Sequence, residues 1–237
     1  MDIGILGTGM VGQALGRKLV QGGHRVCLGS RTADNPTAAA WARGRGPNAT
    51  HGTFAEAARF GHLLFNCTAG VASLEALRRA GEENLRGKVL IDVANPLDFS
   101  HGLPPTLAFC NTDSLGEQIQ RAHPEVRVVK ALNTMNCEVM VDPARVPGEH
   151  HVFLSGNDAG AKRTVATLLS DAFGWPPQRI LDLGDISTAR GPEMLLPLWV
   201  RLWSALGTPD INFQVAGVSV RTAAAIPQPI STPVSGG

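Results

Sequence analysis

A glycine-rich segment directly after the first apolar run constrains the fold of this chain more than any other feature. The run Ile3–Leu6 is followed by Gly7-Thr8-Gly9-Met10-Val11-Gly12, and apolar residues then recur at helical spacing as far as Leu19. A Gly-x-Gly-x-x-Gly pattern between a strand and an amphipathic helix is the arrangement that binds dinucleotides. The segment therefore predicts a strand, a tight turn and a helix that together hold a dinucleotide.

Each glycine of the motif has its own expected task. Gly7 permits the tight turn, Gly9 lets the backbone approach the pyrophosphate, and Gly12 lets the helix pack closely on the strand. The backbone N–H groups of residues 8–11 would then face the phosphates at the helix N-terminus. The alternative is an ordinary glycine-rich turn without a ligand.

The end of the next predicted strand, Arg25–Leu28, indicates which dinucleotide binds. Enzymes that use NAD usually carry Asp or Glu there to hold the ribose 2′-hydroxyl, whereas a 2′-phosphate requires a cation and small donors. This chain has Ser30-Arg31-Thr32 at that point. Arg31 can make a forked, charge-assisted contact with the phosphate, and the two flanking hydroxyls can donate to it. We therefore predict NADP(H) as the cofactor, the alternative being a solvated arginine in a loop.

Short apolar runs alternate with helical patterns along most of the chain. Because parallel strands need crossover connections, this alternation predicts an α/β protein with a doubly wound, mostly parallel sheet, the Rossmann fold. We expect a Rossmann domain at 1–135, a smaller α/β annex packed on it at 136–220, and a disordered tail at 221–237. The expected strands are Ile3–Leu6, Arg25–Leu28, His62–Cys67, Lys88–Val93, Arg127–Leu132, Val152–Ser155 and Arg179–Leu183.

The segment Pro192–Leu206 is apolar on almost every side. A helix of that kind has to be buried all round, and one small domain covers only one side of it. We therefore predict a homodimer in which the second copy covers the other side.

Polar and small residues follow several predicted strands at their carboxyl ends, where doubly wound sheets bind ligands. They are Thr68-Ala69-Gly70, Asn95 and Asn133-Thr134. We expect Thr68, Ala69, Gly70, Asn95 and Asn133 to line the cofactor site, with the two asparagines as candidate catalytic residues that position the nicotinamide and the acceptor. The alternative is that they only make turns. For Lys130, within an apolar strand, pairing with a carboxylate or reaching an edge is favoured over acid catalysis.

Composition excludes several other classes of function. The formal net charge is +1 and there is no Lys/Arg run, so we expect no nucleic-acid partner; no apolar stretch is long enough for a membrane span. The four cysteines are far apart and Asp2 interrupts any signal peptide, so we expect a cytoplasmic protein with free thiols. His150-His151 lacks further ligands at suitable spacing, so we expect no metal. With no Tyr, the Tyr/Lys chemistry of short-chain dehydrogenases is excluded.

The motifs together resemble a known family. The glycine turn with Gly29-Ser30-Arg31, the stretch Val129–Thr134 and the segment Gly184-Asp185-Ile186 are similar to the NADPH-dependent deazaflavin (coenzyme F-420) oxidoreductases, and also to the NADPH-binding domain of the STEAP ferric reductases. The resemblance implies hydride transfer between NADPH and a flavin-like ring stacked on the nicotinamide. Where the archaeal enzymes have His and Thr-Ile-Pro, this chain has Asn133 and Thr68-Ala69-Gly70, so the acceptor is left open.

Three functions compete on the sequence alone. The first is an NADPH-dependent oxidoreductase that passes hydride to a deazaflavin or flavin, a small-molecule acceptor. The second is an imine or ketone reductase, although those families carry a long all-helical C-terminal domain and this chain has about one long helix available. The third is an NADPH-binding sensor or partner-binding module without turnover.

Overall fold

The computed structural model describes residues 1–217 and contains a six-stranded parallel sheet in the order β3-β2-β1-β4-β5-β8. This is the doubly wound order of a Rossmann fold, so the predicted fold class is confirmed. The predicted disordered tail lies outside the described residues. The strands are β1 Asp2–Leu6, β2 Arg25–Ser30, β3 Ala49–Thr53, β4 Leu63–Asn66, β5 Val89–Asp92 and β8 Arg127–Lys130.

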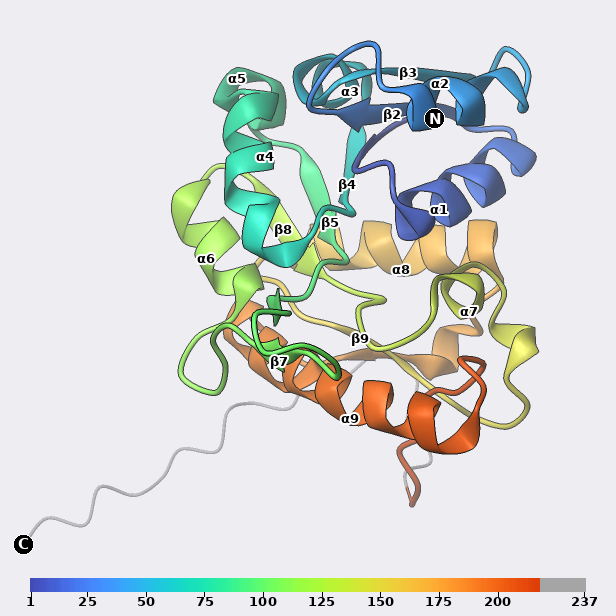
Figure 1. Ribbon diagram of the computed structural model, residues 1–237, viewed down its shortest axis with the longest axis vertical. Helices are drawn as coiled ribbons and strands as arrows, with labels where there is room; N and C mark the ends of the chain where they lie inside the picture. The colour runs from blue at the N-terminus through green and yellow to red at the C-terminus, as the bar shows by residue number, and fades with distance from the viewer. Residues whose placement is uncertain (218–237) are drawn as a thin grey trace, which may run out of the picture.

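Helices cover both faces of the sheet. Successive residues of a strand point to opposite faces, and the strands carry apolar side chains on both. Ile3 and Ile5 of β1 pack into one hydrophobic cluster and Leu6 into another. Figure 1 shows α1 and α8 on one side of the sheet and α4 and α6 on the other. The helices of the Rossmann part are α1 Met10–Gln21, α2 Pro36–Arg43, α3 Phe54–Phe60, α4 Ser73–Ala80, α5 Glu82–Leu85 and α6 Leu115–Ala122.

The edge strand β3 was missing from the sequence prediction. It pairs in parallel with β2, with Val26 beside Ala49 and Ser30 beside Thr53. Thr50 and His51 are exposed, and Gly52 contributes no side chain to an apolar pattern. An edge strand that is covered on one side has no continuous apolar run, so the hydrophobic pattern that would indicate a strand is weak.

The C-terminal part carries a separate two-stranded sheet. Strands β9 (Val152–Leu154) and β10 (Ile180–Asp182) pair in parallel, and an antiparallel bridge joins Lys130 to Ser155. Helix α8 (Ala159–Phe173), capped by the side chain of Asp158, packs into the same hydrophobic cluster as β1. The annex thus packs on the Rossmann part, while the boundary at residue 135 stays a prediction.

The remaining elements are α7 Cys137–Val141, α9 Arg190–Leu206, the hairpin β6 Leu97–Asp98 and β7 Thr106–Leu107, and 3-10 turns at Gly70–Ala72, Pro143–Arg145, Pro177–Arg179 and Ile186–Ala189.

The helix α9 is buried on one side only, so the protomer by itself does not bury this apolar helix all round. Figure 1 shows it in orange, beyond β9. Its buried residues include Leu196 and Trp199. Four large apolar residues of α9 have exposed fractions between 39% and 60%: Met194, Leu198, Trp203 and Leu206. No helix among residues 1–217 is long and apolar enough to cross a bilayer.

The exposed side of α9 leads to a testable prediction about assembly. We expect light scattering at micromolar concentration to give twice the mass of one chain, because a second copy would remove the apolar side chains of both helices from water. Leu198→Glu should then shift the protein to a monomer, since it places a charge in the interface. A monomeric mass for the unaltered protein would contradict the prediction.

Candidate functional site

The glycine turn between β1 and α1 has the geometry of a ligand cradle. Gly7 has a φ of 121°, and a Cβ there would lie 2.4 Å from the Cys67 carbonyl oxygen. A Cβ at Gly12 would lie 2.3 Å from the Gly7 carbonyl oxygen. These two glycines are therefore required by the packing of the protein itself. Gly9 differs, because a Cβ there would meet nothing within 4 Å. The open space lies where the dinucleotide motif places a pyrophosphate.

The N-terminus of α1 offers backbone donors to this space. Gly9 is the N-cap residue, and the first turn holds no acidic side chain. The first N–H groups of a helix have no partner within the helix, and the helix dipole favours an anion beside them. The Gln13 side chain donates to the Thr8 carbonyl oxygen at 2.9 Å and so braces the turn. The geometry fits a pyrophosphate, and the assignment of residues 7–12 to it stays a prediction.

The segment Ser30-Arg31-Thr32 lies beside the glycine turn, because Leu6 pairs with Gly29 and the Gly7 N–H donates to the Gly29 carbonyl oxygen at 3.0 Å. Ser30 is buried and its hydroxyl donates to the Thr32 carbonyl oxygen. The Ser30 hydroxyl thus shapes the turn, whereas Arg31 and Thr32 are exposed. Binding of a 2′-phosphate here stays a prediction, and the exposed pair offers the donors for it.

On the other side of the glycine turn, the loop after β4 is tied to the sheet through Asn66. The Thr68 hydroxyl donates to the Asn66 Oδ1 at 2.7 Å, and the Asn66 amide donates to Asp92 at 2.8 Å. A Cβ at Gly70 would lie 2.0 Å from the Asn95 carbonyl oxygen. The structure therefore brings Gly70 against Asn95, while the neighbouring Ala69 is exposed.

The two predicted asparagines form a reciprocal pair. The Asn95 amide donates to the Asn133 carbonyl oxygen at 2.8 Å, and the Asn133 amide donates to the Asn95 Oδ1 at 2.9 Å. Leu132 has a φ of 64°, a rare conformation for a branched residue, and it turns the chain sharply after β8. Asn133 is 2% exposed and Asn95 is partly exposed. Asn95 is thus the member that reaches the surface, and Asn133 holds it in place.

Lys130 is fully buried, so it does not reach an edge. Its ammonium lies 2.6 Å from Asp92 and 2.7 Å from Glu193, which agrees with the predicted pairing with a carboxylate. Asp92 and Glu193 were not among the predicted residues. Each is a carboxylate inside an apolar strand or helix. Because buried charges are rare unless they are paired, this placement could have indicated a buried ion pair.

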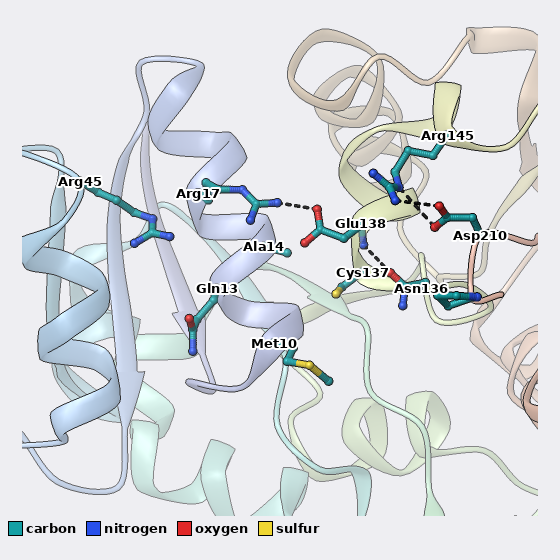
Figure 2. Close-up of a pocket in the computed structure, with 11 residues that line it drawn as sticks. Met10, Gln13, Ala14, Arg17, Arg45, Asn136, Cys137, Glu138, Arg145 and Asp210 are labelled. Atoms are coloured by element: carbon teal, nitrogen blue, oxygen red, sulfur yellow. Dashed lines mark hydrogen bonds and ion pairs between the residues drawn. The ribbon is translucent and has the colours of Figure 1, made fainter. Parts of the chain in front are cut away.

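A pocket of about 470 Å³ opens between α1 and α7, next to the glycine turn (Figure 2). Met10, the first residue of α1, belongs to both the turn and the pocket. Across the pocket Arg17 pairs with Glu138 at 2.6 Å, and Arg145 pairs with Asp210 at 2.7 Å. Sequence reasoning missed this pocket because its walls come from distant segments. They are lined by Met10, Gln13, Ala14, Arg17, Arg45, Asn136, Cys137, Glu138, Arg145, Pro209 and Asp210.

The thiols near these features are not activated. Burial raises the pKa of Cys67, and it also raises the pKa of Cys137 at the start of α7. Both sulfurs are therefore protonated at neutral pH. A nucleophilic cysteine needs a lowered pKa, so neither side chain is a candidate nucleophile.

Comparison with known proteins places the chain in a family. The family model described as NADP oxidoreductase, coenzyme F420-dependent, matches residues 2–96. A crystal structure from Arthrobacter sp. FB24, described as an F420-dependent NADP reductase, has a TM-score of 0.86 and 53% sequence identity; the match covers 91% of this chain and 99% of that one. Rat metalloreductase STEAP3 is 30% identical over 201 residues, or 83% of this chain; the match spans only 37% of the rat protein.

More distant structures share the fold alone. A hypothetical protein of Sinorhizobium meliloti is 20% identical with a TM-score of 0.63, covering 80% of this chain and 88% of that one. An imine reductase of Myxococcus stipitatus in complex with NADP⁺ is 16% identical with a TM-score of 0.60, covering 87% of this chain and 63% of that one. Because the Arthrobacter structure matches nearly the whole length of both chains at 53% identity, and the family model matches the N-terminal part, this chain belongs to the coenzyme F420-dependent NADP oxidoreductase family and is an NADP-dependent oxidoreductase.

Proposed function

We propose that the protein transfers hydride between NADP(H) and a deazaflavin or flavin ring, with deazaflavin as the better acceptor. The observation that carries this proposal is the Asn95–Asn133 pair at the carboxyl edge of the sheet. Asp92 and Lys130 are the last residues of β5 and β8, at this edge. Both ionisable side chains are buried and paired with each other. Within the described residues, the edge therefore offers hydrogen-bond donors and acceptors, with no free acid.

That donor set suits a ring acceptor. NADP(H), when bound, supplies the hydride, and hydride transfer requires the two reacting rings to stack about 3–3.5 Å apart. A flavin-like ring spreads the arriving negative charge over its own atoms, so the protein has to orient the rings and donate a few hydrogen bonds. A ketone would instead form an alkoxide, which needs a proton donor within reach. Asn95 and Thr68 can orient a ring, but neither is an acid.

The family description and the Arthrobacter structure both name F420, a deazaflavin, which supports this acceptor. The imine or ketone reductase alternative has weaker support: imine reductases share the fold at 15–18% identity, and this chain covers about 60% of their length. The sensor alternative has support from the same feature, because the ionisable side chains Asp92 and Lys130 at this edge are buried and paired with each other. The cytoplasmic location is part of the proposal.

The proposal predicts a specific defect for Asn133→Ala. Turnover with a deazaflavin should fall about tenfold or more, because Asn95 loses the partner that holds its amide, whereas affinity for adenosine 2′,5′-bisphosphate, the adenosine half of the cofactor, should change less than about twofold. Steady-state oxidation of NADPH and calorimetric binding measure the two quantities. Gln118→Ala, which removes a carboxamide on α6 bonded to Asp113, is the matched control and should leave both unchanged.

A panel of acceptors separates the competing functions. We expect oxidation of NADPH with deazaflavin and, more slowly, with flavins, and little with aldehydes, ketones, imines or hydroxy acids. Turnover confined to imines or carbonyl compounds would overturn the proposal in favour of a reductase of that class. Tight NADPH binding with no turnover across the whole panel would favour a sensor.

A further inference from the structure

A buried ionic cluster lies directly behind the loops of the carboxyl edge. The Lys130 ammonium of β8 lies 2.6 Å from Asp92 of β5 and 2.7 Å from Glu193 of α9, and it donates to the Ala94 carbonyl oxygen at 2.7 Å. The side chains of Lys130 and Asp92 are 0% exposed and that of Glu193 is 3% exposed. The cluster therefore joins two strands of the sheet to the C-terminal helix.

The charges of the cluster are balanced by a helix terminus. Burial by itself lowers the pKa of Lys130, but the neighbouring Asp92 and Glu193 carboxylates outweigh it and raise that pKa above its ordinary value, so the ammonium stays charged. Two carboxylates then face one cation. Glu193 also accepts from the backbone N–H groups of Leu115 and Gly116 at 2.8 and 3.1 Å, at the N-terminus of α6. The partial positive charge there stabilises the second carboxylate.

The cluster reaches the candidate site along two short paths. In the first, the Asp92 Oδ1 accepts from Asn66, whose own oxygen accepts from the Thr68 hydroxyl. In the second, Lys130 holds the carbonyl group of Ala94, which directly precedes Asn95. The loops after β4 and β5 are thus both bonded to one set of charges, and Glu193 links that set of charges to α9.

These two loops lie opposite the Arg31 side of the glycine turn. A dinucleotide bound across the switch point puts its adenosine on the β2 side, so its nicotinamide falls on the side of β4 and β5. We propose that Asp92, Lys130 and Glu193 are positioning residues that hold Thr68 and Asn95 in the geometry that receives the nicotinamide half of NADP(H), with α9 as the element that sets this geometry. The inference rests on the cofactor site in the proposed function, and it holds for any acceptor.

A cluster that served only stability would have no reason to discriminate between the two halves of the cofactor. Buried ion pairs are weak contributors to stability, and apolar replacements of similar volume often serve as well. The distinguishing measurement is therefore the affinity for NADPH compared with that for adenosine 2′,5′-bisphosphate, which keeps the phosphates of the adenosine half and lacks the nicotinamide.

Glu193→Gln is the primary variant. It is isosteric and removes one of the two buried negative charges, but its amide places an N–H against either Lys130 or the Leu115 N–H. We expect calorimetry to show NADPH affinity lowered about five- to tenfold, with adenosine 2′,5′-bisphosphate affinity within about twofold of the unaltered protein. Lys130→Met should show the same split, to a larger degree.

Arg190→Gln is the matched control, because Arg190 of α9 pairs with Glu117 of α6 and so links the same two helices without touching Lys130. It should leave the ratio of the two affinities unchanged. Thermal unfolding checks that each variant folds; if Lys130→Met does not, Glu193→Gln and Asp92→Asn decide the matter. Parallel losses of both ligands, or unchanged NADPH affinity in folded variants, would overturn the inference. Failure of adenosine 2′,5′-bisphosphate to bind the unaltered protein would instead count against the proposed cofactor site.

Discussion

Replacing Gly9 by valine is expected to abolish the binding of NADPH and of NADH while the protein stays folded. The position has φ −76° and ψ −176°, an extended conformation that valine adopts readily, and a Cβ there meets no protein atom within 4 Å. The fold therefore tolerates the side chain. The same side chain would fill the space predicted for the pyrophosphate, so the loss should be at least about a hundredfold for both cofactors.

The measurement is calorimetric titration of both cofactors, with circular dichroism to show that the secondary structure is intact. Gly44→Val is the matched control, since Gly44 also has a negative φ and a Cβ there would meet no atom closer than 3.8 Å, but it lies at the end of α2. It should leave affinity unchanged. Retained NADPH affinity in the Gly9 variant would show that the motif is only a turn. Gly12→Val offers a contrast, because its Cβ would meet the Gly7 carbonyl and the protein should unfold more easily.

Replacing Arg31 by alanine is expected to change cofactor preference. Loss of a charge-assisted contact with the 2′-phosphate should weaken NADPH by about 1.5–3 kcal/mol, more than about tenfold, and leave NADH almost unchanged. Arg31 is exposed beside the glycine turn, so its removal should not disturb the core. The control is Arg43→Ala, at the exposed end of α2, which should affect neither cofactor. Equal losses of NADPH and NADH on removing Arg31 would exclude the assignment.

Much of the fold was predictable because its signals are local. The glycine turn, the alternation of apolar strands with helices and the side-chain caps at Thr53, Ser114 and Asp158 are all encoded within a few residues, and the structure has each of them. A capping side chain and a helix dipole act over one turn, so neighbouring letters suffice to predict them. The edge strand β3 was missed because half-exposed residues carry no clear period.

The candidate site was predictable only in part. The residues after β4, β5 and β8 could be assigned to one edge, since the carboxyl ends of parallel strands meet there. The contacts among these residues could not be predicted from the sequence. Asn95 and Asn133 are 38 positions apart, and no local pattern indicates that Asn133 is the buried member of the pair. A resemblance to a family supports the cofactor, but it does not reveal which asparagine reaches the surface.

What the sequence by itself determined is the glycine turn between the first strand and the first helix, the doubly wound fold class and the set of residues placed at the carboxyl edge. Only the tertiary structure decided that Lys130 is paired rather than solvated, and that Glu193 on α9 reaches the N-terminus of α6, 77 positions away. The physical reason is that a charge inside an apolar segment is tolerated only with a partner, and nothing local says where that partner lies. Long-range packing brings the ammonium, the two carboxylates and the helix terminus together, and it thereby links the loops after β4 and β5 to one set of charges.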